Sequence, residues 1–296
     1  MPSKESLTIK KLLTAEGFHQ KWESPETIRQ YIATLPSYPA LSEKQEGFET
    51  RCFQSSSGLL MNYYISHGVI EKGTVIYLHG GAYIEEILPP HFAFAEQWTK
   101  QTGQTVILPN YPTVPAMDAK DLTGLMREFY KFACPQARGS VFLMGDSAGG
   151  ALALDMAQSV KGTPHQPKRL ILLSPWVDAA TDNPCISELG IPQRDVFLQP
   201  AGLREVGKIY AGVLPMEDPA VSPLFGEMKN LPSTVILIGT DDCLLPDARL
   251  LRDKLIREGV DTEYWEYENM MHVWPLFPMP EAEDALKRLY QWITRD

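Results

Sequence analysis

The chain has 296 residues, of which 44% are apolar, so it can bury a sizeable core within a single α/β unit. Its formal net charge is −10 and it contains no lysine- or arginine-rich run, which argues against nucleic acid and anionic membranes as partners. The sequence contains no stretch of about 18 apolar residues, so we expect no integral membrane segment. The N-terminal residues also lack the apolar core of a signal peptide.

The four cysteines are scattered along the chain at positions 52, 134, 185 and 243. This spacing favours reduced thiols over a disulfide framework and predicts a cytoplasmic protein. The sequence contains no zinc-ligand spacing, phosphate loop or dinucleotide fingerprint, so we expect neither a metal nor a cofactor. A homodimer is compatible with this composition.

Residues 1–45 mix charged residues with short helical patterns. In the helix predicted over 24–32, Ser24 can serve as the N-cap and Pro25 as the first helical residue. Pro36 then breaks the pattern. We interpret this segment as an appendage that contributes to a cap over the core. A helix docked on the outside of the core explains the same pattern.

Residues 46–296 alternate between apolar strand-like runs and helical patterns. Two runs joined by the turn at 55–58 predict an antiparallel hairpin. The alternation that follows predicts a mostly parallel sheet with helices on both faces. A proline-rich stretch over 179–231 interrupts it and is interpreted as a cap insertion. We expect strands at 48–54, 59–65, 74–78, 105–108, 169–173, 234–238 and 262–267 and before Ser147, and helices at 91–101, 116–133, 200–211, 246–258 and 280–293 and after Ser147.

An apolar strand pattern runs into Gly145-x-Ser147-x-Gly149, and an alanine-rich helical pattern leaves it. The two glycines allow a strand and a helix to approach closely, and the sharp turn between them exposes the serine hydroxyl above the sheet edge. Ser147 is therefore the candidate nucleophile. It needs a base within hydrogen-bond reach, because a serine hydroxyl is almost fully protonated at neutral pH.

His272 is the candidate base, because it closely follows the last predicted strand and can take and return a proton as a neutral imidazole. His79 opens a glycine pair and is expected to brace that loop. The other histidines lie in polar or loop-like context and are expected at the surface: His19, His67, His91 and His165.

The group that orients the base should come from a strand end between Ser147 and His272. Asp242 is the candidate carboxylate there, with Asp241 as the alternative. A carboxylate in this position fixes the tautomer of the imidazole and favours its charged form. An aspartate that only caps the next helix is the simpler explanation of the same residue.

Negative charge on a tetrahedral intermediate requires preorganised donors. The N–H of Ala148 follows the nucleophile at a predicted helix start and is one candidate. The loop at 80–82 follows a buried strand and can supply others, because paired glycines allow the backbone to approach a substrate. The aromatic and sulfur-containing residues near these loops are candidate walls of a substrate pocket: Tyr83, Trp176, Met270, Met271 and Trp274.

The segments 79–82, 145–150, 242–244 and 271–274 together resemble the hormone-sensitive-lipase-like carboxylesterases of the α/β-hydrolase fold. The resemblance covers roughly residues 60–296. It implies the triad Ser147, Asp242 and His272, a helical cap, and oxyanion donors at Gly81, Ala82 and Ala148. The family usually carries a third glycine where this chain has Ala82, which keeps the backbone N–H but adds a Cβ atom.

These features predict a serine hydrolase that cleaves carboxylic esters with short to medium acyl chains through an acyl-enzyme. Two alternatives use the same residues differently. The His-Gly-Gly-x-aromatic loop, which ends at Tyr83, also resembles that of arylformamidases, which cleave an amide. A ligand receptor built on this fold would keep the pocket without the chemistry.

Overall fold

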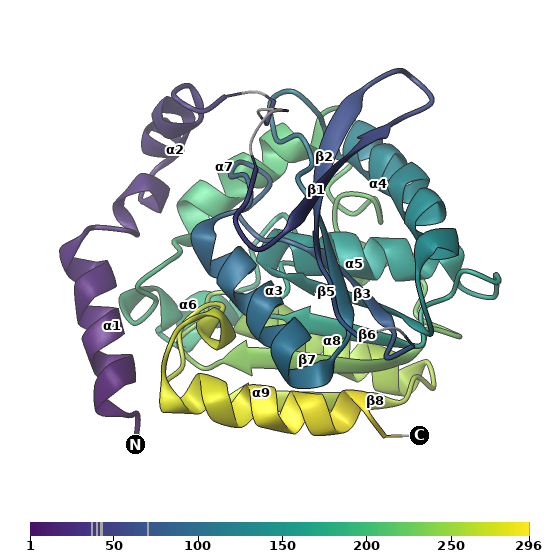
Figure 1. The fold of residues 1–296 in the computed structure, drawn as a ribbon. Helices are drawn as coiled ribbons and strands as arrows, with labels where there is room; N and C mark the ends of the chain where they lie inside the picture. Colours follow the sequence, from purple (N-terminus) through teal and green to yellow (C-terminus); the bar gives the residue numbers. More distant parts are fainter. Residues whose placement is uncertain (37, 40, 42–43, 70, 296) are drawn as a thin grey trace.

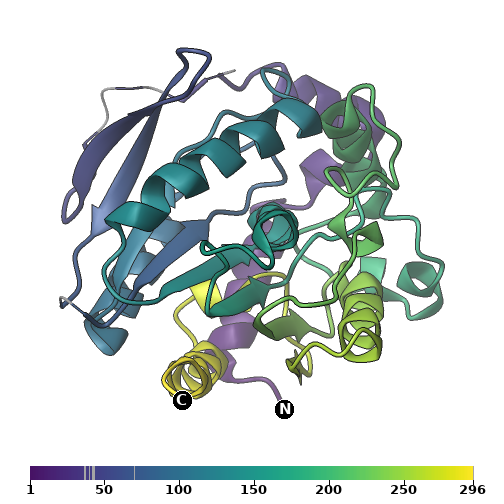
Figure 2. The same ribbon diagram turned by 90° about the vertical axis from the view of Figure 1, so that its right-hand side faces the viewer.

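The computed structural model describes residues 1–36, 38–39, 41, 44–69 and 71–295. An eight-stranded sheet with the order β1-β2-β4-β3-β5-β6-β7-β8 forms its centre. Strand β2 is antiparallel to both β1 and β4, and the remaining neighbours run parallel. Helices α3 and α9 cover one face of the sheet, and α4, α5 and α8 cover the other (Figures 1 and 2). The predicted fold class, a mostly parallel sheet with helices on both faces, is confirmed.

The strands are β1 (Glu49–Gln54), β2 (Leu60–Ser66), β3 (Thr74–Leu78), β4 (Thr105–Pro109), β5 (Val141–Asp146), β6 (Arg169–Leu173), β7 (Ser233–Gly239) and β8 (Thr262–Tyr267). The α-helices are α1 (Lys4–Ala15), α2 (Pro25–Ile32), α3 (Pro89–Thr102), α4 (Ala119–Ala133), α5 (Ser147–Val160), α6 (Cys185–Glu188), α7 (Pro200–Ala211), α8 (Leu245–Arg257) and α9 (Pro280–Ile293). Among the described residues, no helix combines the length and the apolar character that a membrane crossing requires.

The central strands are buried along almost their whole length, as expected for parallel strands covered on both faces. Strands β1 and β8 form the edges and keep several exposed or half-exposed positions. Because β3, β5, β6, β7 and β8 run parallel, their carboxyl ends meet at one edge of the sheet. The loops that carry the candidate functional residues leave from this edge.

Two predicted helices differ from the structure at their ends for local reasons. The helix expected over 116–133 begins at Ala119, because the side chain of Asp118 accepts the N–H of Asp121 at 3.1 Å and caps it. The helix expected over 91–101 already begins at Pro89, because proline suits a first helical turn. It extends to Thr102, where Gly103 with φ 73° ends it.

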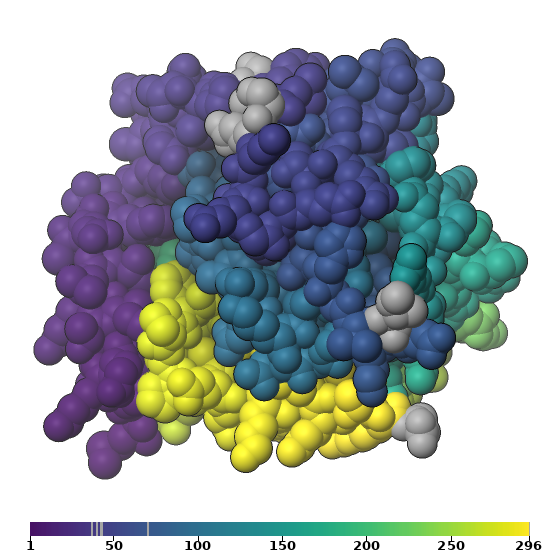
Figure 3. All heavy atoms as spheres, viewed as in Figure 1, coloured from purple at the N-terminus to yellow at the C-terminus, as the bar shows by residue number. Residues whose placement is uncertain are grey.

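The N-terminal segment lies along one side of the molecule, as α1 followed by α2 (Figures 1 and 3). Ser24 caps α2 through a capping box, as predicted. Helix α2 packs against α7, which lies in the stretch 179–231, and Arg29 pairs with Glu205 at 2.7 Å. The predicted cap segment 1–45 includes residues 37, 40, 42 and 43, which lie outside the described residues.

Two glycines in helix interiors provide a test of this packing. A Cβ atom on Gly202 of α7 would lie 2.6 Å from the Cα atom of Trp22, whereas a Cβ atom on Gly124 of α4 would meet nothing within 4 Å. We expect Gly202→Ala to destabilise the protein by about 1–3 kcal/mol, because helix and segment must separate. Gly124→Ala should stabilise it by about 0.5–1 kcal/mol, because alanine is the better helix former.

Urea unfolding of both variants measures the difference. Gly124→Ala is the matched control, since it makes the same chemical change in an open position. Equal effects of the two substitutions would contradict the close contact between α7 and the N-terminal segment.

Candidate active site

The turn between β5 and α5 holds Ser147 in a left-handed conformation, with φ 52°. This backbone is strained for a residue with a side chain. A Cβ atom on Gly145 would lie 2.1 Å from the carbonyl oxygen of Gly149, and one on Gly149 would lie 2.1 Å from that of Leu78. Strand and helix can therefore meet only because both positions are glycine. The predicted strand–turn–helix geometry around Ser147 is present.

Three predicted residues from three separate loops form one hydrogen-bonded chain. The Nε2 atom of His272 lies 3.0 Å from the Oγ atom of Ser147, and its Nδ1 atom lies 2.9 Å from the Oδ2 atom of Asp242. The other carboxylate oxygen of Asp242 accepts the N–H of Leu244 at 2.9 Å. All three side chains are buried, so water competes little for these bonds.

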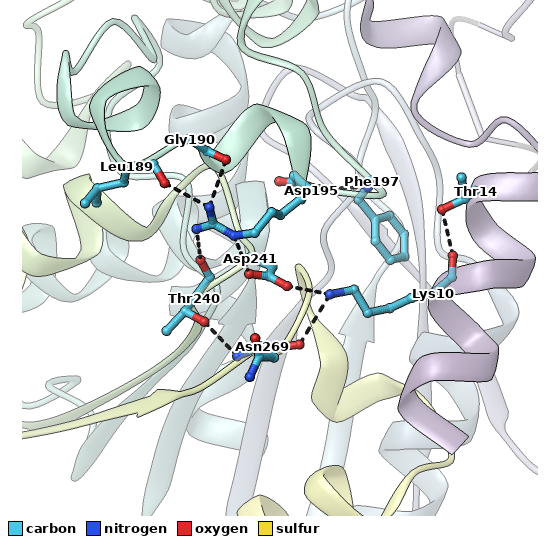
Figure 4. A network of polar contacts seen from close by, with 10 residues as sticks. Lys10, Thr14, Leu189, Gly190, Asp195, Phe197, Thr240, Asp241 and Asn269 are labelled. Carbon is cyan, nitrogen blue, oxygen red and sulfur yellow. Dashed lines mark hydrogen bonds and ion pairs between the residues drawn. The ribbon is translucent and has the colours of Figure 1, made fainter. Parts of the chain in front are cut away.

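Asp241, the alternative carboxylate, points away from the imidazole. Its Oδ1 atom accepts from the guanidinium of Arg194 at 2.9 Å, and its Oδ2 atom lies 2.5 Å from the ammonium of Lys10 on α1 (Figure 4). Of the two neighbouring aspartates, only Asp242 is hydrogen-bonded to His272.

The imidazole of His272 is surrounded by negative charge. Burial lowers its pKa, but the charge and hydrogen bond of Asp242 oppose this effect, and the charges of Asp195 and Asp146 add to the opposition. The net pKa of His272 is raised above its ordinary value of 6.5. The site thus stabilises a charged imidazolium, as a group that accepts a proton during a reaction requires.

The predicted oxyanion donors lie at the same edge of the sheet. Gly81 and Ala82 both have positive φ, 115° and 52°, and both line the cavity that contains Ser147. Within the described residues, no hydrogen bond outside the helices and strands uses the N–H of Gly81 or Ala82. The preceding N–H, that of Gly80, donates to the Oδ1 atom of Asp146 at 2.9 Å and ties this loop to the residue before the nucleophile.

His79 lies beneath this loop. It is fully buried, stacks on Tyr111 at 4.1 Å between ring centroids, and its Nδ1–H donates to the carbonyl of Gly80 at 2.7 Å. The hydroxyl of Tyr111 donates to the carbonyl of His79. Burial, together with the neighbouring His91, lowers the pKa of His79 to about 3, so its ring is neutral. These contacts fit the predicted bracing role.

His91 was expected at the surface, and that prediction is wrong. It is only 4% exposed, and its Nε2 atom lies 3.5 Å from the Oδ2 atom of Asp146. Its Nδ1 atom accepts the N–H of Leu88 at 2.9 Å. The reason is the start of α3 at Pro89, which places the third helical residue over the nucleophile turn. The two prolines directly before His91 were the available signal.

The cavity above Ser147 has a volume of about 100 Å³, which is small beside the 300–1,000 Å³ or so of pockets for drug-sized ligands. Its walls come from the N-terminal segment, the oxyanion loop, the stretch 179–231 and the loop of His272. Its lining residues are Phe18, Lys21, Trp22, Gly81, Ala82, Glu85, Leu88, His91, Asp146, Ser147, Phe197, Leu198, His272 and Val273.

The predicted wall residues Tyr83, Trp176, Met270, Met271 and Trp274 are not among these lining residues. Each is at most 2% exposed and packs in the core beneath the loops. The ring of Tyr83 stacks on that of Tyr210 at 3.7 Å between centroids. The indole N–H of Trp176 donates to Thr181 at 2.8 Å. These aromatic residues therefore pack beneath the loops of the site and do not line the cavity.

Residues that the sequence did not indicate supply the cavity walls instead. Lys21 donates to Glu85 at 2.8 Å, so the N-terminal segment contacts the loop that follows β3. Phe197 lies over His272, with ring centroids 6.1 Å apart. Neither belongs to a motif, and both are placed by contacts between distant segments. Within the described residues, no group of three or more His, Cys, Asp or Glu side chains could hold a metal ion.

Comparisons with known proteins agree with this geometry. The family model of the α/β-hydrolase fold matches residues 75–276. An acetyl-hydrolase of Streptomyces hygroscopicus is 29% identical over 222 residues, which are 72% of this chain and 73% of that protein. An esterase of Acinetobacter venetianus is 28% identical over 227 residues, which are 74% of each. The crystal structure of an esterase from the bacterial hormone-sensitive lipase family superposes with a TM-score of 0.81 at 23% identity, covering 99% of this chain and 98% of that one.

The charges around His272 predict its titration. In the wild-type protein we expect its pKa to lie above 6.5, because Asp242 outweighs burial. In Asp242→Asn the opposing charge is lost while burial remains, so the pKa should fall below the ordinary value. NMR titration of isotope-labelled histidine measures both midpoints. Asp241→Asn is the matched control and should leave the midpoint unchanged, and a similar drop in that variant would contradict the assignment.

Proposed function

Because the chain belongs to the α/β-hydrolase fold family, we propose that it is a serine esterase in which Ser147, His272 and Asp242 form the catalytic triad. The observation that carries this proposal is the hydrogen-bonded chain from the hydroxyl of Ser147 through the imidazole to the carboxylate, with distances of 3.0 and 2.9 Å. Such a chain allows the imidazole to activate a serine hydroxyl.

The resemblance to esterases of this fold, noted in the sequence, is confirmed by the family match and by relatives named as acetyl-hydrolase, esterase and triacylglycerol lipase. The protein is a carboxylesterase- or lipase-like hydrolase. The assignment of individual residues to steps of the reaction is our proposal and rests on their geometry.

In the first half-reaction, the Nε2 atom of His272 takes the proton of Ser147 while the Oγ atom attacks the ester carbonyl. The imidazolium that forms is stabilised by the carboxylate of Asp242. The carbonyl π electrons move to the oxygen, whose negative charge the N–H groups of Gly81, Ala82 and Ala148 stabilise. When the intermediate collapses, the alcohol leaves with the proton from His272, and the acyl group stays on Ser147.

In the second half-reaction, a water molecule replaces the alcohol. His272 takes a proton from this water while the water oxygen attacks the acyl carbonyl. The same N–H donors stabilise the second oxyanion. The C–O bond to Ser147 then breaks, and its Oγ atom recovers the proton from His272. The carboxylic acid leaves, and the enzyme returns to its starting state without an external reductant, oxidant or metal ion.

We also propose that residues 1–45 and 179–231 form a cap over this site, as the sequence suggested. Phe18, Lys21 and Trp22 from the first segment and Phe197 and Leu198 from the second line the same cavity. A cavity of about 100 Å³ favours short acyl chains.

We further propose a cytoplasmic location. The four cysteines carry free thiols in the structure, which supports it.

Hydrolysis of p-nitrophenyl acetate tests the proposed triad. We expect turnover by the wild type and a decrease in kcat on the order of 10⁴–10⁶-fold in Ser147→Ala, because the acyl-enzyme cannot form. A fluorophosphonate probe should label the wild type and leave this variant unlabelled. Ser187→Ala is a control substitution of an exposed serine in α6 and should keep the labelling. Equal turnover by wild type and Ser147→Ala, or a strong preference for aryl formamides over esters, would contradict the proposal.

A series of p-nitrophenyl esters from acetate to octanoate tests the size of the cavity. We expect kcat/KM to be highest for the shortest chains and to fall about tenfold or more by octanoate, consistent with about 1–3 kcal/mol for an overfilled pocket. Leu198→Ala enlarges the cavity without removing a hydrogen bond of its backbone, so the optimum should move to longer chains. An octanoate optimum in the wild type would contradict the proposed preference for short acyl chains.

A further inference from the structure

A second buried carboxylate lies beside the triad and belongs to the cap insertion. Asp195 precedes α7 and is 5% exposed. Its Oδ1 atom accepts the N–H groups of Phe197 and Leu198 at 2.8 and 2.9 Å, and its Oδ2 atom accepts the N–H of Cys243 at 2.8 Å. One carboxylate thus joins a wall of the substrate cavity to the residue that follows Asp242 in the chain.

The neighbouring residue makes a parallel contact on the outside of the same loop. Arg194 donates to the carboxylate of Asp241 at 2.9 Å and to the carbonyls of Leu189 and Gly190, both at 2.9 Å (Figure 4). Arg194 therefore binds the residue before Asp242, and Asp195 binds the residue after it. Two consecutive residues of the cap insertion hold the loop of the triad carboxylate from both sides.

The two contacts differ in their relation to the imidazole. Arg194 and Asp241 neutralise one another, with Lys10 as a second cation, at the outer side of the loop. Within the described residues Asp195 has no cationic partner other than the imidazole. Three backbone N–H groups and the thiol of Cys243 are its hydrogen-bond partners. Burial and the charge of Asp242 raise the pKa of Asp195 to about 6, while His272 opposes this rise.

The charged groups around His272 are few. Asp242 is bonded to its Nδ1 atom, and Asp195 and Asp146 contribute further negative charge. Asp146 is itself engaged by Tyr77 at 2.7 Å and faces His91. Across the cavity, Lys21 and Glu85 pair with each other at 2.8 Å. Asp195 is therefore the carboxylate near the imidazole, besides Asp242, that neither a cationic side chain nor a hydroxyl engages among the described residues; its side-chain partner is the neutral thiol of Cys243.

We propose that Asp195 is a positioning residue of the esterase, which fixes the loop that carries Asp242 and stabilises the imidazolium of His272 with its negative charge. This inference rests on the proposed triad. The same side chain sets the backbone of Phe197, whose ring lies over the imidazole. One carboxylate thus contributes both to the placement of the cap insertion over the site and to the basicity of His272.

The pH dependence of kcat/KM for p-nitrophenyl acetate distinguishes this role from that of a mere structural tie. His272 must be neutral to accept a proton, so activity falls as the pH decreases through its pKa. Removing the charge in Asp195→Asn lowers that pKa, so the acid limb should move to lower pH, by about 1 on the pH scale. On the plateau kcat should fall about tenfold, because the imidazolium loses a stabilising charge.

Asp195→Glu keeps the charge and should restore the acid limb of the wild type, even where its longer side chain lowers kcat. Asp241→Asn is the matched control, since it removes a carboxylate from the same loop but on the outer side. It should keep the acid limb of the wild type. If Asp195→Asn does not fold, Asp195→Ser replaces it, because a serine hydroxyl can accept the same local N–H groups without a charge.

An acid limb that is unchanged in Asp195→Asn overturns the proposal and leaves Asp195 as a structural tie. An equal shift in Asp241→Asn overturns it as well, because a loosened loop would then explain both. The pKa of His272, followed by NMR in the same variants, does not depend on turnover. If no ester is hydrolysed, the proposed function fails, while a lowered pKa of His272 in Asp195→Asn still supports the contact inferred here.

Discussion

The close approach of α5 to the strands beneath it is the constraint on which the active centre depends. The carbonyl oxygens of Leu78 and Gly149 occupy the space that side chains at positions 149 and 145 would need. With this space free, the first turn of α5 lies directly on the sheet, and Ser147 takes its left-handed backbone at the carboxyl edge. The hydroxyl of Ser147, the positive end of the helix and the loop after β3 therefore meet at one point.

This constraint is local, which explains why the sequence indicated it. Gly145, Ser147 and Gly149 stand within five positions, and the flanking apolar and alanine-rich runs predict the strand and the helix. The order Ser147, Asp242 and His272 along the chain then points to three loops that the structure brings together. Strand and helix positions follow from periodicity in the same way. The differences at Ala119 and Pro89 reflect one capping side chain, Asp118, and one proline that suits a first helical turn.

The remaining features depend on contacts between distant segments, which no local pattern contains. Asp241 and Asp242 are chemically identical, and only the partners Arg194 and Lys10 decide which of them turns outward. His91 is buried because α3 places it over the nucleophile turn. Tyr83 is withdrawn from the cavity because its ring stacks on that of Tyr210 in α7. In each case the side chain is placed by a partner on another element. The sequence predicts such elements along the chain but does not indicate how they pack against one another.

The same long-range contacts make the cap part of the catalytic geometry under the proposed function. The N-terminal segment reaches the oxyanion loop through Lys21 and Glu85, and the insertion reaches the loop of the triad carboxylate through Asp195. A displacement of either cap segment would therefore alter a group that the reaction needs as well as the access of substrate. Packing of the cap and chemistry at Ser147 are linked through these few polar contacts.

A reaction of this kind creates a cation and an anion a few ångströms apart, and the site treats them differently. The side of the imidazole is lined by carboxylates, Asp242 and Asp195, which favour the positive charge on His272. Under the proposed function, the side of the oxyanion presents backbone N–H groups and the start of α5, and the carboxylate of Glu85 nearby is paired with Lys21. Asp146 lies between the two, and its charge is engaged by Tyr77 and the N–H of Gly80. Under the proposed function, this separation of charge allows one small cavity to stabilise both ions.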